Sequence, residues 1–84
     1  MLDLAHTLTV TASGSGKVVS SPKGINCGKR CSNSFTVGTN VTLTAIPEKK
    51  HEFLGWTGAC VASGTSLTCT VPMMKAETVG AFFS

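Results

Sequence analysis

The chain has 84 residues, of which 42% are hydrophobic and 13% are charged. This length accommodates one small domain, and this composition is typical of a folded module rather than of a disordered segment. Seven Lys or Arg residues against four Asp or Glu residues give a net charge of +3, and the basic residues are scattered along the chain. This distribution excludes the clustered positive charge that a nucleic-acid-binding surface needs.

Residues 1–6 precede the first predicted strand. They carry neither the basic segment of a signal peptide nor an apolar run long enough to cross a membrane. We interpret them as a leader or linker, and residues 7–84 as a single module that does not insert into a membrane.

Alternating apolar and polar residues predict β-strands, and no window has the three- and four-residue apolar spacing of an amphipathic helix. Over residues 7–12, apolar side chains alternate with threonines, which is the pattern of a strand with one face in solvent. The Ser-Gly-Ser-Gly sequence at 13–16 predicts a hairpin turn, followed by a return strand at 17–21. Val18 and Val19 are adjacent in that strand, so alternation leaves open which of them is buried.

The segment at 22–31 contains proline and glycine, and it is predicted to be a surface loop that carries the first cysteine pair. Strand patterns resume at 34–37 and 40–45. Pro47 ends the second of these strands, because proline cannot donate a hydrogen bond to the ladder. A charged turn at 48–52 follows.

Large apolar residues return at 53–56, and alternation predicts the last strand at 78–83. The intervening Met-Met-Lys-Ala-Glu segment at 73–77 is the one place where a short helical turn could form. The side chains predicted to form the core are Leu8, Val10, Val41, Leu43, Phe53, Trp56, Val71, Val79 and Phe83.

The chain has four cysteines, an even number that in so short a sequence is typical of a disulfide framework in an oxidising compartment. A tetrahedral zinc site is the alternative. Eight residues separate Cys60 from Cys69, which is outside the usual spacing of paired zinc ligands. We therefore predict disulfides, with no metal and no other cofactor.

A two-residue turn at 64–65, with glycine first, would place Cys60 directly opposite Cys69 in a hairpin. In that register Trp56 and Leu67 share a face with both cysteines, so the apolar pattern and the disulfide agree on the buried side. The four cysteines allow three pairings, and this register selects Cys60–Cys69 and leaves Cys27–Cys31 as the second bond.

Residues capable of catalysis are few. Neither His6 nor His51 has an evident partner that would orient it as a general base, and no pair of carboxylates lies in an apolar setting. We therefore predict no catalytic residues, and His51 is interpreted as a solvent-facing residue of the charged turn.

Two features could contact a ligand. Trp56 is interpreted as a core residue rather than as a platform for a sugar ring, because it shares the predicted buried face of the second cysteine pair. Lys23, Lys29 and Arg30 form a candidate basic surface around the first pair, which could contact acidic glycans or teichoic polymers. Ordinary solvated loop charge is the simpler explanation for that surface.

Two motifs are more specific than composition. Gly-Ile-Asn-Cys-Gly at 24–28 is followed by Cys31, and Phe-Leu-Gly-Trp-Thr-Gly-Ala-Cys at 53–60 is followed by Cys69. With the strand patterns around them, they make residues 7–83 resemble the divergent internalin B-type B-repeat. The resemblance implies a small β-rich module without known catalytic residues, often in tandem, in bacterial surface and secreted proteins. It also implies a relation to repeats with a β-grasp-like sheet.

We expect an all-β fold, a mostly antiparallel small sheet of hairpins stapled by disulfides. An α+β, β-grasp-like fold with one short helical turn is the alternative. The expected location is extracellular or on the bacterial cell surface.

The expected function is that of a non-catalytic structural or adhesive repeat, a spacer or protein-interaction element of a larger protein. Its partners would be neighbouring repeats or domains, and surface glycans or proteins, with the isolated module monomeric. The alternative is an accessory module that binds carbohydrate or a cell-wall polymer through the loops at 23–30 and 48–52, with Trp56 exposed.

Overall fold

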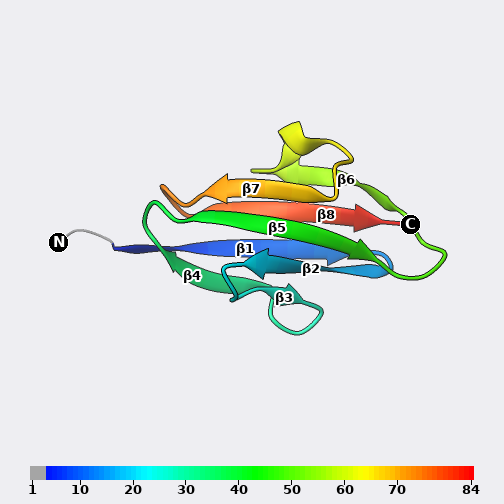
Figure 1. Cartoon of the computed structure of the whole chain (residues 1–84), viewed down its shortest axis with the longest axis horizontal. Coiled ribbons are helices and arrows are strands. Elements are labelled where there is room, and N and C mark those ends of the chain that lie inside the picture. Colours follow the sequence, from blue (N-terminus) through cyan, green and yellow to red (C-terminus); the bar gives the residue numbers. More distant parts are fainter. Residues whose placement is uncertain (1–3) are drawn as a thin grey trace.

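A computed structural model describes residues 4–84, so the predicted leader at 1–6 lies partly outside the described residues. The described part consists of eight strands and one short 3-10 helix, η1 (Figure 1). The strands are β1 (Ala5–Ser13), β2 (Gly16–Ser21), β3 (Asn26–Cys27), β4 (Ser32–Thr36), β5 (Asn40–Pro47), β6 (Phe53–Gly58), β7 (Thr68–Pro72) and β8 (Glu77–Phe83), and η1 spans Val61–Ser63.

The strands form two four-stranded sheets, in the orders β4-β1-β8-β6 and β3-β2-β5-β7. All pairings are antiparallel except that of β1 with β8, which is parallel. The predicted all-β, mostly antiparallel class is therefore confirmed, with the strands divided between two sheets. Residues 73–76 contain no helical turn, so the β-grasp-like alternative finds no support there. Among the described residues, no helix is long and apolar enough to cross a membrane.

Alternation determines the inner face of each long strand. Leu8 and Val10 of β1 are buried, and the threonines between and beside them are exposed. In β2 the pairing with β5 places Val18 opposite Ala45 on the inner face, and Val19 is only half-buried on the outer face. The structure thus settles the orientation that the adjacent valines left open.

The turn at 13–16 differs from the predicted hairpin, because β1 and β2 lie in different sheets. Gly14 makes this sharp crossing possible, since its φ is +93° and a Cβ there would overlap the carbonyl oxygen of Phe83. The chain therefore leaves one sheet and enters the other within two residues. Alternation continues through the crossing, so the inner faces of β1 and β2 point at each other.

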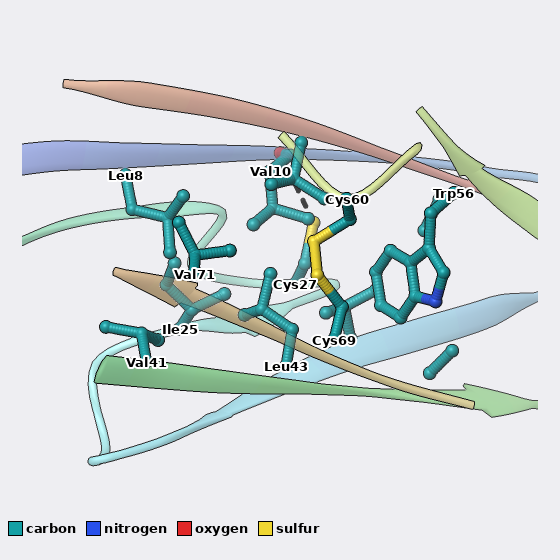
Figure 2. Packing of buried hydrophobic residues seen from close by; sticks show 14 of the residues in the cluster. Leu8, Val10, Ile25, Cys27, Val41, Leu43, Trp56, Cys60, Cys69 and Val71 are labelled. Atoms are coloured by element: carbon teal, nitrogen blue, oxygen red, sulfur yellow. Dashed lines mark hydrogen bonds between the residues drawn. A yellow bond between two sulfur atoms is a disulfide. The ribbon is translucent and has the colours of Figure 1, made fainter. Parts of the chain in front are cut away.

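A single core lies between the sheets, and Figure 2 shows apolar side chains from both of them meeting there. Of the nine predicted core residues, Phe53 is half-buried and the other eight are buried, namely Leu8, Val10, Val41, Leu43, Trp56, Val71, Val79 and Phe83. Phe53 packs edge-on against Trp56, with ring centroids 4.9 Å apart. Ile25, in the segment predicted as a surface loop, is also buried.

Candidate functional site

Hydrogen bonds hold both turns of the segment between β2 and β4, through the Ser20 side chain at the first turn and through backbone groups at the second. Ser20 Oγ donates to the carbonyl oxygen of Pro22 at 2.7 Å and accepts from the N–H of Ile25 at 3.0 Å. Farther along, the N–H of Arg30 donates to the carbonyl oxygen of Asn26 at 2.8 Å, and the N–H of Asn26 returns a bond to Arg30 at 2.9 Å. These bonds give a glycine-containing loop one defined shape.

The first disulfide joins Cys27 to Cys31, with 4.3 Å between their Cα atoms. Cys27 is buried, and the carbonyl oxygen of Cys31 accepts a hydrogen bond from the N–H of Val10 at 2.6 Å. Ile25 inserts into the core beside them. The disulfide therefore closes the loop while its two flanks are held to the body of the module.

Two of the three residues of the candidate basic surface line the same pocket. Lys23 and Arg30 line one open pocket of about 680 Å³, whereas Lys29 is exposed and lies outside that lining. The other residues that line the pocket are Val19, Ser20, Gly24, Ile25, Asn26 and Asn33. Two cationic groups beside side-chain amides can hold an anionic, hydroxyl-bearing ligand.

A second, smaller concavity adjoins the same loop. It is lined by the start of β2 (Gly16 and Lys17), the end of β5 (Ile46 and Pro47), Gly28 and Glu48. The N–H of Glu48 donates to the carbonyl oxygen of Ser15 at 3.1 Å, which fixes the start of the charged turn. The loops at 23–30 and 48–52 thus contribute one residue each, Gly28 and Glu48, to this concavity, and Lys49 and Lys50 line neither pocket.

The second disulfide joins Cys60 to Cys69, with 5.9 Å between their Cα atoms. Cys60 follows β6 in one sheet and Cys69 lies in β7 of the other, so this bond ties the two sheets together. The cysteines are paired as predicted, but the hairpin that led to this pairing is wrong. β6 pairs with β8, and β7 pairs with β5.

The predicted two-residue turn at 64–65 does form within this connection. Gly64 has φ 58° and ψ −117°, the conformation that a type II′ turn requires, and the N–H of Ser66 donates to the carbonyl oxygen of Ser63 at 3.0 Å. The residues that flank the turn do not pair, because η1 precedes it and the chain then crosses to the other sheet. Leu67, predicted to be buried, is 50% exposed as a result.

Trp56 lies beside this inter-sheet disulfide (Figure 2). Its indole N–H donates to the carbonyl oxygen of Ser66 at 2.6 Å, and only 4% of the residue is exposed. The version of the carbohydrate-binding alternative that needs an exposed tryptophan is therefore wrong. Trp56 packs the core and anchors the β6–β7 connection.

The two histidines lie in separate parts of the described chain, His6 in β1 and His51 in the turn before β6. The ring nitrogen Nδ1 of His51 lies 2.9 Å from the carbonyl oxygen of Ser84, and His6 is half-buried in β1. Within residues 4–84, no three His, Cys, Asp or Glu residues cluster in a way that could hold a metal ion. All four cysteines are in disulfides, so none is a thiolate ligand of the zinc alternative.

The two ends of the described chain lie at opposite ends of the molecule (Figure 1). Because β1 and β8 run parallel and side by side, the chain enters at the start of β1 and leaves at the far end of β8. The carbonyl oxygen of Leu4 accepts from the N–H of Val37 at 2.8 Å at the entry, and the N–H of Ser84 donates to Glu52 at 2.8 Å at the exit. Sequence patterns carried no signal for this arrangement, since it depends on a pairing between the two termini.

The model of the family described as the divergent InlB B-repeat domain matches residues 6–84. No curated protein and no solved structure matches the chain.

Proposed function

The chain belongs to the divergent InlB B-repeat domain family, and from this we propose that it acts as a spacer module within a larger bacterial surface or secreted protein. Members of the family are typically repeat modules of bacterial surface proteins and are generally non-catalytic. The two disulfides are consistent with an extracellular location, because such bonds persist in oxidising compartments. Its neighbours in the chain would be further repeats or other domains.

The observation that carries this proposal is the separation of entry and exit. Leu8 lies opposite Glu77 and Ser13 lies opposite Phe82 in the parallel pair, so Phe83 extends beyond the end of β1. The path from Ala5 to Phe83 then covers nine strand positions, or about 30 Å at the rise of a β-strand. A module of this kind lengthens the protein that contains it, whereas one with adjacent termini adds a side branch.

A tandem of this chain tests the spacer role. Two and three copies joined directly would be compared with one copy by small-angle X-ray scattering. The maximum dimension of two copies is expected to be about twice the 48 Å long axis of one, and to grow by a similar step with the third. A dimension that stays near that of a single copy would show that the copies fold back on one another, and would refute the spacer.

A second candidate function is supported by the pocket that Lys23 and Arg30 share. It is the binding of an anionic cell-wall polymer whose phosphates would meet these two side chains. The probe is poly(glycerol phosphate), titrated at low and high salt against the K23Q/R30Q variant. The matched control is K49Q/K50Q, which removes the same charge from the turn at 48–52, outside the pocket lining.

Binding that is lost in K23Q/R30Q and retained in K49Q/K50Q would support a polymer site. If both variants bind the polymer equally weakly, the binding is only the general attraction of an anion to a basic protein, which falls with salt. No binding by the unchanged chain would refute it.

A further inference from the structure

We propose that the paired β1 and β8 strands are a shear clamp that makes the module a load-bearing element. This rests on the proposed spacer function, because tension reaches the module only if it lies in line between its neighbours. The inference concerns how the module resists that tension. It follows from the direction of the two terminal strands.

Tension applied at the two ends pulls β1 and β8 in opposite directions along their own axes. β1 is drawn towards its N-terminal end and β8 towards its C-terminal end, and the two strands are parallel neighbours. Their contact extends over six residue pairs, from Leu8–Glu77 to Ser13–Phe82. The strands can slide apart only if the hydrogen bonds between them break together, whereas strands pulled apart from one end lose these bonds one at a time.

The clamp lies at the centre of its sheet. On its other edge, β1 pairs with β4 at Leu8 and Thr9, and the N–H of Val10 donates to Cys31. On the other edge of β8, β6 pairs from Val79 to Phe83. On the inner face, Val10 lies opposite Val79 and Ala12 opposite Ala81, and both residues of β8 are fully buried. From this inner face, water therefore has little access to replace the inter-strand hydrogen bonds as they lengthen, and an unreplaced buried bond is costly to break.

Both ends of the clamp are held against fraying. At the exit, Glu52 and Ser84 exchange two hydrogen bonds of 2.8 Å, one from each backbone N–H. At the entry, the N–H of Val37 bonds to Leu4. These bonds hold the start of β1 to the segment after β4 and the end of β8 to the turn before β6, so both strands are fixed in place on either side of the six-pair ladder.

Neither disulfide crosses the clamp. Cys27–Cys31 closes the loop before β4, and Cys60–Cys69 joins the β6 connection to β7. They limit how far the chain extends once the clamp has failed. Nine extended residues would span roughly 32 Å, whereas the Cα atoms of Cys60 and Cys69 are 5.9 Å apart. Four extended residues would span roughly 14 Å, whereas the Cα atoms of Cys27 and Cys31 are 4.3 Å apart.

Single-molecule force spectroscopy on the oxidised chain tests the clamp by changing only the direction of pull. In one geometry, the handles are at the two termini. In the other, they are at the N-terminus and at Met74, which is 65% exposed in the loop before β8, through an unnatural amino acid that adds no thiol. Met73 is hydrogen-bonded to Gly38 and Thr39, at the end of the molecule where β1 begins, so this second pull peels the strands.

The terminal pull is expected to need several times the force of the peeling pull, because it loads the six pairs together and the peeling pull loads them one at a time. The unfolding step should also be roughly 36 Å shorter than for a chain without disulfides, because the bonds keep both loops closed. Equal forces in the two geometries would overturn the clamp. That result would leave an extended tandem intact, whereas a compact tandem with a strong terminal clamp would overturn the spacer alone.

A matched pair of variants separates the clamp from general stability. Val79 of β8 and Val41 of β5 are both fully buried, and alanine removes the same two methyl groups from each. V79A is expected to lower the terminal unfolding force, because its contacts are lost when the clamp slides. V41A should leave that force unchanged, because contacts that survive in the transition state do not alter the unfolding rate. A similar fall in both variants would refute the clamp.

Discussion

Replacing Cys60 and Cys69 with alanine removes the covalent bond between the two sheets. The bond closes a loop whose sequence separation is nine residues, and chain entropy alone assigns it about 2.7 kcal/mol. Both cysteines are buried, so the lost sulfur atoms also leave a small void in the core. We expect a loss of about 3 kcal/mol in the free energy of unfolding, a large fraction of the stability of a domain this small.

The matched control is the C27A/C31A variant. This bond has a sequence separation of four, for which the same entropy argument gives about 2 kcal/mol. Urea unfolding of the three proteins measures the midpoint and the slope, and thermal unfolding gives the midpoint temperature. The C60A/C69A variant should melt at least about 10 °C below the unchanged chain and also below the control.

Two results would refute this reasoning. If C60A/C69A loses less stability than C27A/C31A, the bond between the sheets is not the more important restraint. If both variants unfold at the urea midpoint of the unchanged chain, the noncovalent core alone holds the sheets together.

Three further predictions concern single side chains, each measured by urea unfolding. W56F should cost about 2 kcal/mol, because it leaves a carbonyl oxygen without its indole donor; a neutral result would contradict the bond. G58A should cost more than G38A, because both have positive φ but only at Gly58 would a Cβ meet backbone; equal losses would contradict this. L43A should cost about 3 kcal/mol and L67A under about 0.5, and a reversed order would restore the predicted hairpin.

Alternation predicted the inner face of most strands because burial against a flat core needs only a period of two. Leu8, Val10, Val41 and Leu43 were identified in this way, and the structure buries all of them. Ile25 escaped prediction because it enters the core from a Pro- and Gly-containing loop, where no alternation marks it.

The division of strands between two sheets could not be predicted from local patterns. A turn of the right type forms at Gly64, yet no hairpin follows, because the residues around it cross from one sheet to the other. Gly14 gives a similar crossing at the first turn. Short-range signals specify that the chain reverses, and long-range packing specifies which strand it then meets.

The residues of the candidate site could be predicted from the sequence, but their arrangement could not. The charges of Lys23, Lys29 and Arg30 are visible in the sequence, but only the folded loop places Lys23 and Arg30 around one pocket. The parallel pairing of the terminal strands had no sequence signal at all, because its partners are separated by almost the whole chain.

The most direct test of the account is the pattern of backbone nuclear Overhauser effects between β1 and β8 in the isotope-labelled, oxidised chain. A parallel pattern over the pairs from Leu8–Glu77 to Ser13–Phe82 is expected. An antiparallel pattern would bring the two ends of the chain to one side. That result would contradict both the spacer and the clamp.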